Sequence, residues 1–485
     1  MSEKSLANQA KDEVLFSTDE LLAQEAKYCS WGDTVHYVDK PNIFKSSEGS
    51  YLYDVEGIEF LDLQMWYSAA NFGYRNKRLN SVLKKQIDTL PQLACQYLHE
   101  EKIRLATKLA QRNEMSFEAK GRIHFNVGGS SALEDSLKLV RNYAGRSLVF
   151  AFMGGYHGRT LAASAITSSF RYREHFGHFG DRAFFVPFPY CFRCPYDKKK
   201  DFCDFYCLKQ FERLFETEYH SVVNKKNNKC EFSAFYVEAV QGTGGYIIPP
   251  QEYFSGLKEI LERYDILFVD DEIQMGFFRT GKFWAIEHFN VTPDIIVFGK
   301  ALTNGLNPIS GIWAKEKFIS PEVFPPGSTH STFSSNPLGT AVGLEVMKLI
   351  EDSNFAVDVP KKGQYLINRF KSLQKKYPQI GDVSGLVQKK YPQIGDVDGL
   401  GLALRVEMCG KDGYAPNKEL TDKIVELGLS GKLTAGGRRR GLVLDVGGYY
   451  KNVFTLAPSF YITEKEIDLG CDLFEEALSK ALKKP

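Results

Sequence analysis

Between about Leu79 and Lys300 the chain alternates short apolar runs with segments of helical periodicity. The runs of strand length cover residues 123–125, 148–152, 234–237, 267–269 and 295–298. Such alternation is typical of βαβ units, which build a mainly parallel sheet whose strands end on one face. Because ligands of open α/β sheets bind beyond the carboxyl ends of the strands, the residues that follow each run are the first candidates for a functional site.

The last two runs each deliver a reactive side chain. The segment Phe268–Gln274 carries Asp271, and the segment Asp294–Lys300 ends in Lys300. A lysine that forms a Schiff base and an acid that keeps a ring nitrogen protonated are what pyridoxal phosphate requires from a protein. Strand ends also carry aspartate and lysine simply because they are solvated, so this pair has to be weighed together with the other strand ends.

The first run leads into a glycine-rich segment that favours phosphate binding. Gly128 and Gly129 allow a tight turn, and Ser130 adds a hydroxyl donor. Ser131 and Glu134 have the spacing of a capping box, which predicts that a helix begins here. The free amides and the dipole of a helix start attract phosphate. The alternative interpretation is a capped helix without a ligand.

Two further strand ends carry side chains suited to a planar ligand. Tyr156 lies in the glycine-rich segment 153–158, where an aromatic ring can stack on a cofactor ring. Glu238 ends the run 234–237. Tyr156 could instead be a core residue in a glycine-rich turn, and Glu238 could be an ordinary solvated strand end. Five polar or glycine-rich ends on one predicted face nevertheless indicate a binding site.

The bulk composition narrows the class of protein. A chain of 485 residues exceeds one ordinary core, so we expect two or more domains. Its net charge of +1 argues against a surface dedicated to nucleic acid or to anionic membranes. Apolar stretches of membrane-spanning length and a signal-peptide core are both missing from the sequence, which predicts a cytoplasmic protein.

Nine cysteines make a disulfide framework improbable, because their number is odd and they are spread through a long chain. Four of them cluster with the spacing C-x2-C-x8-C-x3-C: Cys191, Cys194, Cys203 and Cys207. This spacing allows either a tetrahedral structural zinc site or a reduced surface insertion that packs on its own aromatic residues.

From about Gly49 to its C-terminus the chain resembles the class III (ω-amino acid) aminotransferases, which have the type I fold of pyridoxal-phosphate enzymes. The segments that carry the resemblance are Gly129–Glu134, Tyr156–Gly158, Glu238–Gly242, Asp271–Gly281, Phe298–Lys300 and Thr332–Pro337. The segment after Asp271, taken together with Lys300, is the most specific of these.

The resemblance implies an α/β fold in which a large domain with a mainly parallel seven-stranded sheet joins a smaller α+β domain built from both termini. It places residues 1–70 in the small domain, residues 71–345 in the large cofactor-binding domain and residues 346–485 in the small domain again. The cysteine-rich insertion covers about 190–230. Residues 374–401 form a tandem duplication of fourteen-residue units, too few for a solenoid and small enough for a surface loop.

The resemblance also implies roles for individual residues. Lys300 would form the Schiff base with pyridoxal 5'-phosphate and shuttle the proton, and Asp271 would pair with the ring nitrogen. The remaining cofactor contacts would come from Gly129, Ser130, Tyr156, His157, Glu238, Ile273, Gln274 and Thr332. Thr332 would reach over from a second subunit, which implies a homodimer with shared active sites. Trp66 and Tyr67 would line the substrate pocket, unless they are core residues.

These roles predict a ping-pong aminotransferase that moves an amino group from an amine or ω-amino acid to a 2-oxo acid. The donor would be a diamine or resemble 4-aminobutyrate or 2,4-diaminobutyrate. One alternative is an amino-acid racemase or epimerase on the same fold. Another is a non-catalytic scaffold, which the intact Lys300, Asp271 and Tyr156 argue against.

The chain departs from the family pattern at Thr455, where many members carry an arginine that binds the substrate carboxylate. The nearby run Arg438–Arg440 would have to replace that arginine, or else it is an ordinary solvated loop.

Overall fold

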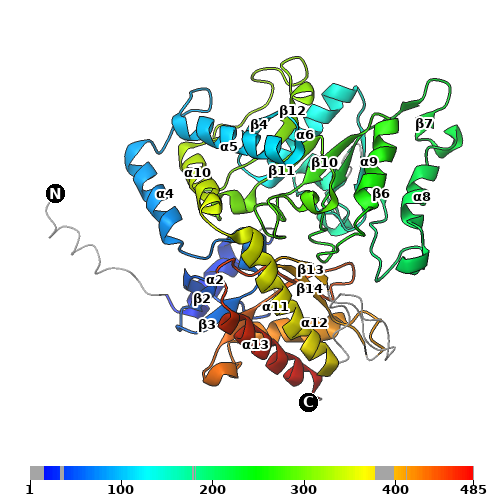
Figure 1. Ribbon diagram of the computed structural model, residues 1–485. Coiled ribbons are helices and arrows are strands. Elements are labelled where there is room, and N and C mark those ends of the chain that lie inside the picture. Colours follow the sequence, from blue (N-terminus) through cyan, green and yellow to red (C-terminus); the bar gives the residue numbers. More distant parts are fainter. Residues whose placement is uncertain are drawn as a thin grey trace.

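The computed structural model describes residues 16–32, 36, 38–176, 180, 182–376, 398–410 and 412–483. A seven-stranded sheet with the order β4-β12-β11-β10-β9-β5-β6 forms the centre of the larger part of the molecule (Figure 1). Its strands are β4 (Gly121–Asn126), β5 (Leu148–Phe152), β6 (Phe184–Val186), β9 (Phe232–Val237), β10 (Leu267–Asp271), β11 (Ile295–Phe298) and β12 (Ser310–Lys315). Only β12 runs antiparallel to its neighbours in this sheet, so the predicted mainly parallel, seven-stranded sheet is confirmed.

The central strands read as continuous apolar runs because both faces of the sheet are covered. In β9, Ala234 and Tyr236 pack in one layer, whereas Phe235 and Val237 pack in the other. The first layer includes α6 and α7, and the second includes α5, α9 and α10. The helices of this part are α4 (Lys77–Thr89), α5 (Glu100–Phe117), α6 (Gly129–Ala144), α7 (Leu161–Ile166), α8 (Tyr206–Arg213), α9 (Tyr253–Arg263) and α10 (Pro337–Glu351).

The smaller part draws on both ends of the chain. In one four-stranded sheet, β15 from the C-terminal third pairs in parallel with β3 from the N-terminal segment. A second sheet has the order β13-β14-β17-β16. The strands are β1 (Phe44–Glu48), β2 (Tyr51–Asp54), β3 (Glu59–Asp62), β13 (Asp398–Leu400), β14 (Ala403–Glu407), β15 (Gly441–Val443), β16 (Asp445–Gly447) and β17 (Val453–Leu456). The helices are α2 (Thr18–Tyr28), α11 (Phe355–Lys376), α12 (Lys418–Leu429) and α13 (Glu464–Leu482), of which α11 and α13 lie side by side in Figure 1.

The predicted capping box at the start of α6 is wrong. The helix begins at Gly129, three residues before the predicted start, and its N-cap Gly128 makes no side-chain capping bond. The Glu134 carboxylate instead accepts hydrogen bonds from the amides of Ala162 and Ala163, at 2.9 and 3.1 Å, at the start of α7. The spacing of a capping box is therefore present, but the Glu134 carboxylate caps the neighbouring helix α7. The first amides of α6 have no side-chain cap.

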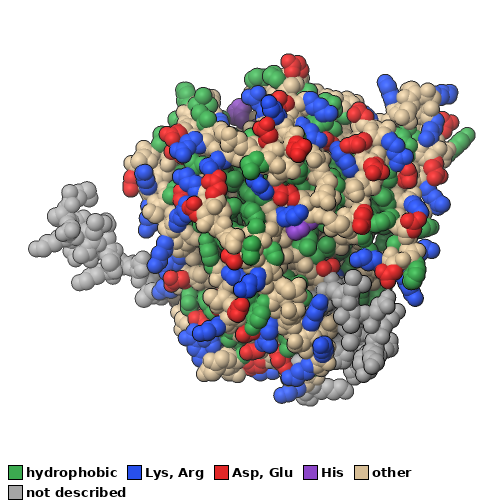
Figure 2. Space-filling view, viewed as in Figure 1, with side chains coloured by type: hydrophobic (Ala, Val, Ile, Leu, Met, Phe, Trp, Pro, Cys, Tyr) green, Lys and Arg blue, Asp and Glu red, His purple; other side chains and the backbone are tan. Residues whose placement is uncertain are grey.

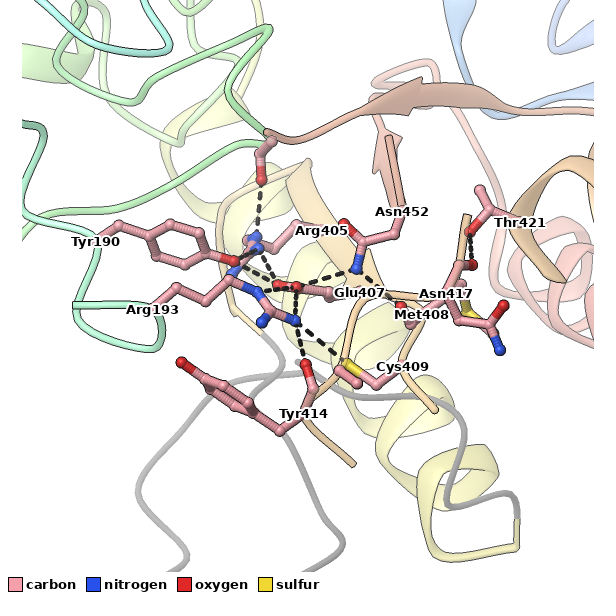
Figure 3. Close-up of polar contacts among 12 residues, drawn as sticks. Tyr190, Arg193, Arg405, Glu407, Met408, Cys409, Tyr414, Asn417, Thr421 and Asn452 are labelled. Carbon is pink, nitrogen blue, oxygen red and sulfur yellow. Dashed lines mark hydrogen bonds and ion pairs between the residues drawn. The ribbon is translucent and has the colours of Figure 1, made fainter. Parts of the chain in front are cut away.

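The cysteine-rich insertion is fastened to β14 by a buried polar cluster around Glu407 (Figure 3). The Glu407 carboxylate accepts hydrogen bonds from Arg193 Nε at 2.5 Å, from Arg405 Nη2 at 2.7 Å, from Asn452 Nδ2 at 3.1 Å and from the Tyr190 hydroxyl. Burial raises the pKa of Glu407, but the two guanidinium groups outweigh it and lower that pKa overall. Removing either arginine would leave a buried carboxylate undercompensated.

The four clustered cysteines line a cavity of about 310 Å³ within this insertion, and all four are free thiols. Within the described ranges, no group of three or more histidine, cysteine, aspartate or glutamate side chains is arranged to hold a metal ion. The described structure therefore gives no support to the zinc interpretation, and the four thiols contribute to the wall of this cavity. Burial also raises the pKa of Cys191 to about 12 and that of Cys207 to about 11, which favours neutral thiols.

Strands β2 and β3 form a hairpin around Gly57, and β14 follows the tandem duplication in the chain. Most of the tandem duplication, residues 377–397, lies outside the described residues. On the face shown in Figure 2, basic and acidic side chains are interspersed, in keeping with the small net charge. Among the helices described, none is long and apolar enough to cross a membrane.

Candidate active site

A cavity of about 320 Å³ opens at the carboxyl edge of the large sheet. Its lining includes every residue predicted for the cofactor and substrate sites except Thr332. The lining residues are Trp66, Tyr67, Ala69, Gly128, Gly129, Ser130, Tyr156, His157, Gly158, Glu238, Asp271, Ile273, Gln274, Lys300, Gly305, Pro308, Ile309 and Ser310. Segments from five strand ends and from the N-terminal region therefore meet at one place.

Lys300 lies two residues beyond the end of β11, at the start of a short 3-10 helix. Burial lowers its pKa to about 8, although the carboxylates of Asp271, Glu238 and Asp445 act to raise it. A substantial fraction of this amine is therefore neutral near pH 8. Only the neutral amine can attack a carbonyl carbon, so the environment prepares Lys300 for a nucleophilic role.

Asp271 is the last residue of β10 and is held from two sides. The Nδ1 atom of His157 lies 2.8 Å from one carboxylate oxygen, and the amide of Ile273 donates to the other at 3.2 Å. Burial acts to lower the pKa of His157, but the hydrogen bond and charge of Asp271 outweigh it and raise that pKa. This contact with His157 holds the Asp271 carboxylate in one orientation at the cavity lining.

Glu238 connects the two glycine-rich segments of the cavity. Its carboxylate accepts hydrogen bonds from the amides of Tyr156 and Gly242, both at 2.9 Å. Burial raises the pKa of Glu238 to about 7, against the opposing charge of His157. We infer that Glu238 positions the Tyr156 ring at the cavity wall.

The start of α6 is suited to a phosphate. The uncapped amides after Gly128 and the hydroxyl of Ser130 border the cavity. Gly158 has a φ of +127°, and a Cβ there would collide with Ser130 Oγ, so a larger residue would close the space. An anion placed here meets free amide donors and the positive end of a sixteen-residue helix.

The residues present therefore fit pyridoxal phosphate. The start of α6 offers an anion site, Tyr156 a flat ring, Asp271 an acid for the ring nitrogen, and Lys300 an amine with a lowered pKa.

The aromatic wall of the cavity is built on an unusual backbone. Met65, Trp66, Tyr67 and Ser68 (α3) all have positive φ, between 45° and 64°. Left-handed conformation costs roughly 1–2 kcal/mol per residue with a side chain. The turn is held by Asp62, whose carboxylate accepts hydrogen bonds from the amides of Gln64 and Met65 at 2.7 and 2.9 Å. Strain of this kind is found where a site needs a fixed geometry, here the two aromatic rings at the cavity mouth.

Several lining residues were not predicted. Gly305, Pro308, Ile309 and Ser310 come from the segment that leads into β12. Because β12 is antiparallel, its first residue lies at the edge where the parallel strands end. The sequence analysis predicted site residues only at the carboxyl ends of strands, and therefore did not include the segment that leads into β12. The apolar run after Ser310 is the signal that would have located this segment.

Other predicted positions lie away from the cavity lining. Thr332 is exposed and lines no part of the cavity of its own chain. Arg438 and Arg440 both bind the Glu59 carboxylate, at 2.6 and 2.8 Å, so this run does not replace the arginine missing at Thr455. Within the described lining, Lys300 is the only lysine or arginine.

The fold and cavity define a pyridoxal-phosphate enzyme of fold type I, and comparison with known proteins gives its family. Residues 35–478 match the aminotransferase class-III family, so the chain belongs to that family. It is a pyridoxal-phosphate-dependent class III aminotransferase, in agreement with the resemblance seen in the sequence.

Its relatives have more than one activity. The alanine/serine racemase of Pyrococcus horikoshii is 29% identical, covering 96% of this chain and 90% of the relative, and the leucine/methionine racemase of Thermococcus litoralis is 30% identical, covering 90% and 91%. The diaminobutyrate–2-oxoglutarate aminotransferase of Haemophilus influenzae is 28% identical, covering 91% of each. The solved structure of a Bacillus anthracis aminotransferase superposes with a TM-score of 0.81 at 25% identity, covering 99% of this chain and 100% of that one.

Proposed function

We propose that the enzyme takes the amino group from an amine or ω-amino acid and passes it to a 2-oxo acid in two half-reactions at this one cavity. The observation that carries the proposal is the meeting of Lys300, Asp271 and an aromatic wall in a cavity whose described lining holds no second lysine or arginine. A donor that lacks an α-carboxylate suits such a wall, because no guanidinium is present to bind one.

Each residue of the site has a separate role in this reaction. Bound pyridoxal phosphate supplies a conjugated ring that takes up the electron pair left on the substrate carbon. Lys300 Nζ holds the cofactor covalently and later moves the proton released at the substrate carbon. Asp271 keeps the ring nitrogen protonated, and His157 holds Asp271. The free amides of α6 and Ser130 bind the phosphate.

The donor is identified by a half-reaction. Holoenzyme is mixed with single amines and ω-amino acids without any 2-oxo acid, and its visible spectrum is followed. We expect a lasting loss of the absorbance of the lysine-linked cofactor, because the amino group stays on the cofactor when no acceptor is present. A spectrum that none of the donors changes would contradict the proposed transamination.

A racemase is the second candidate, because two relatives with nearly full coverage bear that name. The same experiment separates the two activities. A racemase returns to its starting spectrum while the optical rotation of a chiral amino acid disappears, since the proton goes back to the carbon from which it came.

We further propose a homodimer with shared sites. Thr332 is exposed outside its own cavity, and its neighbour Phe333 is 70% exposed, as are Tyr97 (60%) and Leu98 (73%). Large apolar side chains exposed together are typical of an interface. We expect a sedimentation mass of twice 54.9 kDa. Thr332→Ala should weaken cofactor binding without changing this mass, whereas a monomer would contradict the proposal.

A further inference from the structure

The turn between β16 and β17, in the smaller part of the molecule, lies against the segment that follows Glu238 in the larger part. The amide of Gly448 donates to the carbonyl of Thr243 at 3.0 Å. From the neighbouring strand β14, Arg405 Nε donates to the carbonyl of Gly245 at 2.7 Å. The smaller part therefore holds this segment at two of its backbone carbonyls.

Tyr449, in the same turn, contacts two segments of the larger part at once. Its hydroxyl donates to the carbonyl of Met153 at 2.9 Å, and Gln241 Oε1 is a second acceptor at 3.0 Å. Gln241 Nε2 also donates to the Met153 carbonyl, at 2.8 Å. The three groups contact one another in a closed set, so Tyr449 fastens the residue after β5 to the segment after β9.

The position of the Tyr449 ring depends on a glycine. Gly154 has a φ of +82°, and a Cβ built there would collide with the Tyr449 ring. The ring also meets the Tyr190 ring edge-on, with the two centroids 5.9 Å apart. Tyr190 in turn binds Glu407 in the buried cluster. The Tyr449 ring is therefore held by bare backbone and by an anchored aromatic side chain.

The two segments that Tyr449 joins are also joined by Glu238. The Glu238 carboxylate accepts from the amides of Tyr156 and Gly242, both at 2.9 Å. Tyr156 and Glu238 belong to the cavity lining, whereas Tyr449 lies outside it. One pair of segments therefore has two ties, Glu238 at the cofactor site and Tyr449 at the boundary with the smaller part.

We propose that Tyr449 is a positioning residue for the cofactor site: it holds the segment that carries Tyr156 and so fixes the Tyr156 ring at the cavity wall. This role concerns the binding of the cofactor, so it applies to transamination and to racemisation alike. The loss of one hydrogen bond corresponds to about 3- to 10-fold in an equilibrium constant.

The test uses Tyr449→Phe, which removes the hydroxyl and keeps the ring beside Gly154. The Tyr449 side chain is 42% exposed, so this variant should fold. The apoenzyme is titrated with pyridoxal phosphate, and the dissociation constant is read from the visible absorbance. We expect this constant to rise about 3- to 10-fold. The visible circular dichroism of the fully loaded variant should weaken, because the Tyr156 ring is held less firmly beside the cofactor.

Tyr450→Phe makes the same change at the next residue and is the matched control. It should alter neither the dissociation constant nor the circular dichroism. No amino donor enters these measurements, so their outcome is independent of whether the proposed transamination is correct. An unchanged dissociation constant in a folded Tyr449→Phe protein would overturn the proposal.

A double-mutant cycle separates positioning from a general loss of stability. If Tyr449 acts through Tyr156, Tyr449→Phe should weaken cofactor binding much less in a Tyr156→Leu protein than in the wild type. Equal losses in the two backgrounds would contradict this route.

Hydrogen exchange of the apoenzyme gives a readout that needs no cofactor. The Tyr156 amide should exchange faster in Tyr449→Phe than in Tyr450→Phe, because the segment that carries it has lost one of its two ties. Equal exchange rates in the two variants would also overturn the proposal.

Discussion

Replacing Lys300 with alanine should reduce the rate of amino-group transfer at least ~10³-fold, because one change removes both the nucleophile and the proton carrier. The purified variant should also lack the visible absorbance of a lysine-linked cofactor and should release the cofactor on gel filtration. A small diffusible amine should restore part of the activity, since the start of α6 and Asp271 still define the site. Absorbance and single-turnover rates measure both effects.

Lys315→Ala provides the matched control, because this lysine pairs with Asp294 at 2.8 Å and does not line the cavity. The unmodified apoprotein adds a pH test. Since burial lowers the pKa of Lys300 to about 8, the rate of cofactor capture should rise as the pH increases towards 8 and level off above it. A variant at Lys300 that still forms a reducible bond to the cofactor would refute the assignment.

Asp271→Asn should leave the cofactor bound but slow the chemical step by about 10²- to 10³-fold, the size of effect seen when a single electrostatic partner of a developing charge is removed. An amide does not carry the negative charge that keeps the ring nitrogen protonated. The loss should appear in the rate of the half-reaction rather than in the amount of cofactor retained, so the two quantities are measured on the same preparation.

Asp270→Asn is the control for this prediction. Asp270 is the preceding residue of β10, is buried and does not line the cavity, because successive side chains of a strand point to opposite faces. The same change of acid to amide, one residue away, should alter the chemical step far less. Near-normal turnover in Asp271→Asn would contradict the prediction that Asp271 keeps the ring nitrogen of the cofactor protonated.

The predictions from sequence succeeded where local pattern is sufficient. The apolar runs at 148–152 and 295–298 coincide with β5 and β11, because strands buried on both faces require continuous apolar residues. Local pattern failed at Glu134, where a capping box was predicted but a neighbouring helix takes the carboxylate. It also failed at Ser310, because the direction of a strand is not visible in its composition.

The pattern of apolar runs in the sequence was enough to predict the class of fold and the residues at the ends of the parallel strands, because strands buried on both faces must be apolar. The resemblance of the motifs after Asp271 and around Lys300 was enough to indicate the family. The folded chain alone shows that the arginines near the C-terminus bind Glu59 and that Arg405 binds Glu407. These facts depend on strand register and on contacts between residues far apart in the chain, which composition and spacing do not encode.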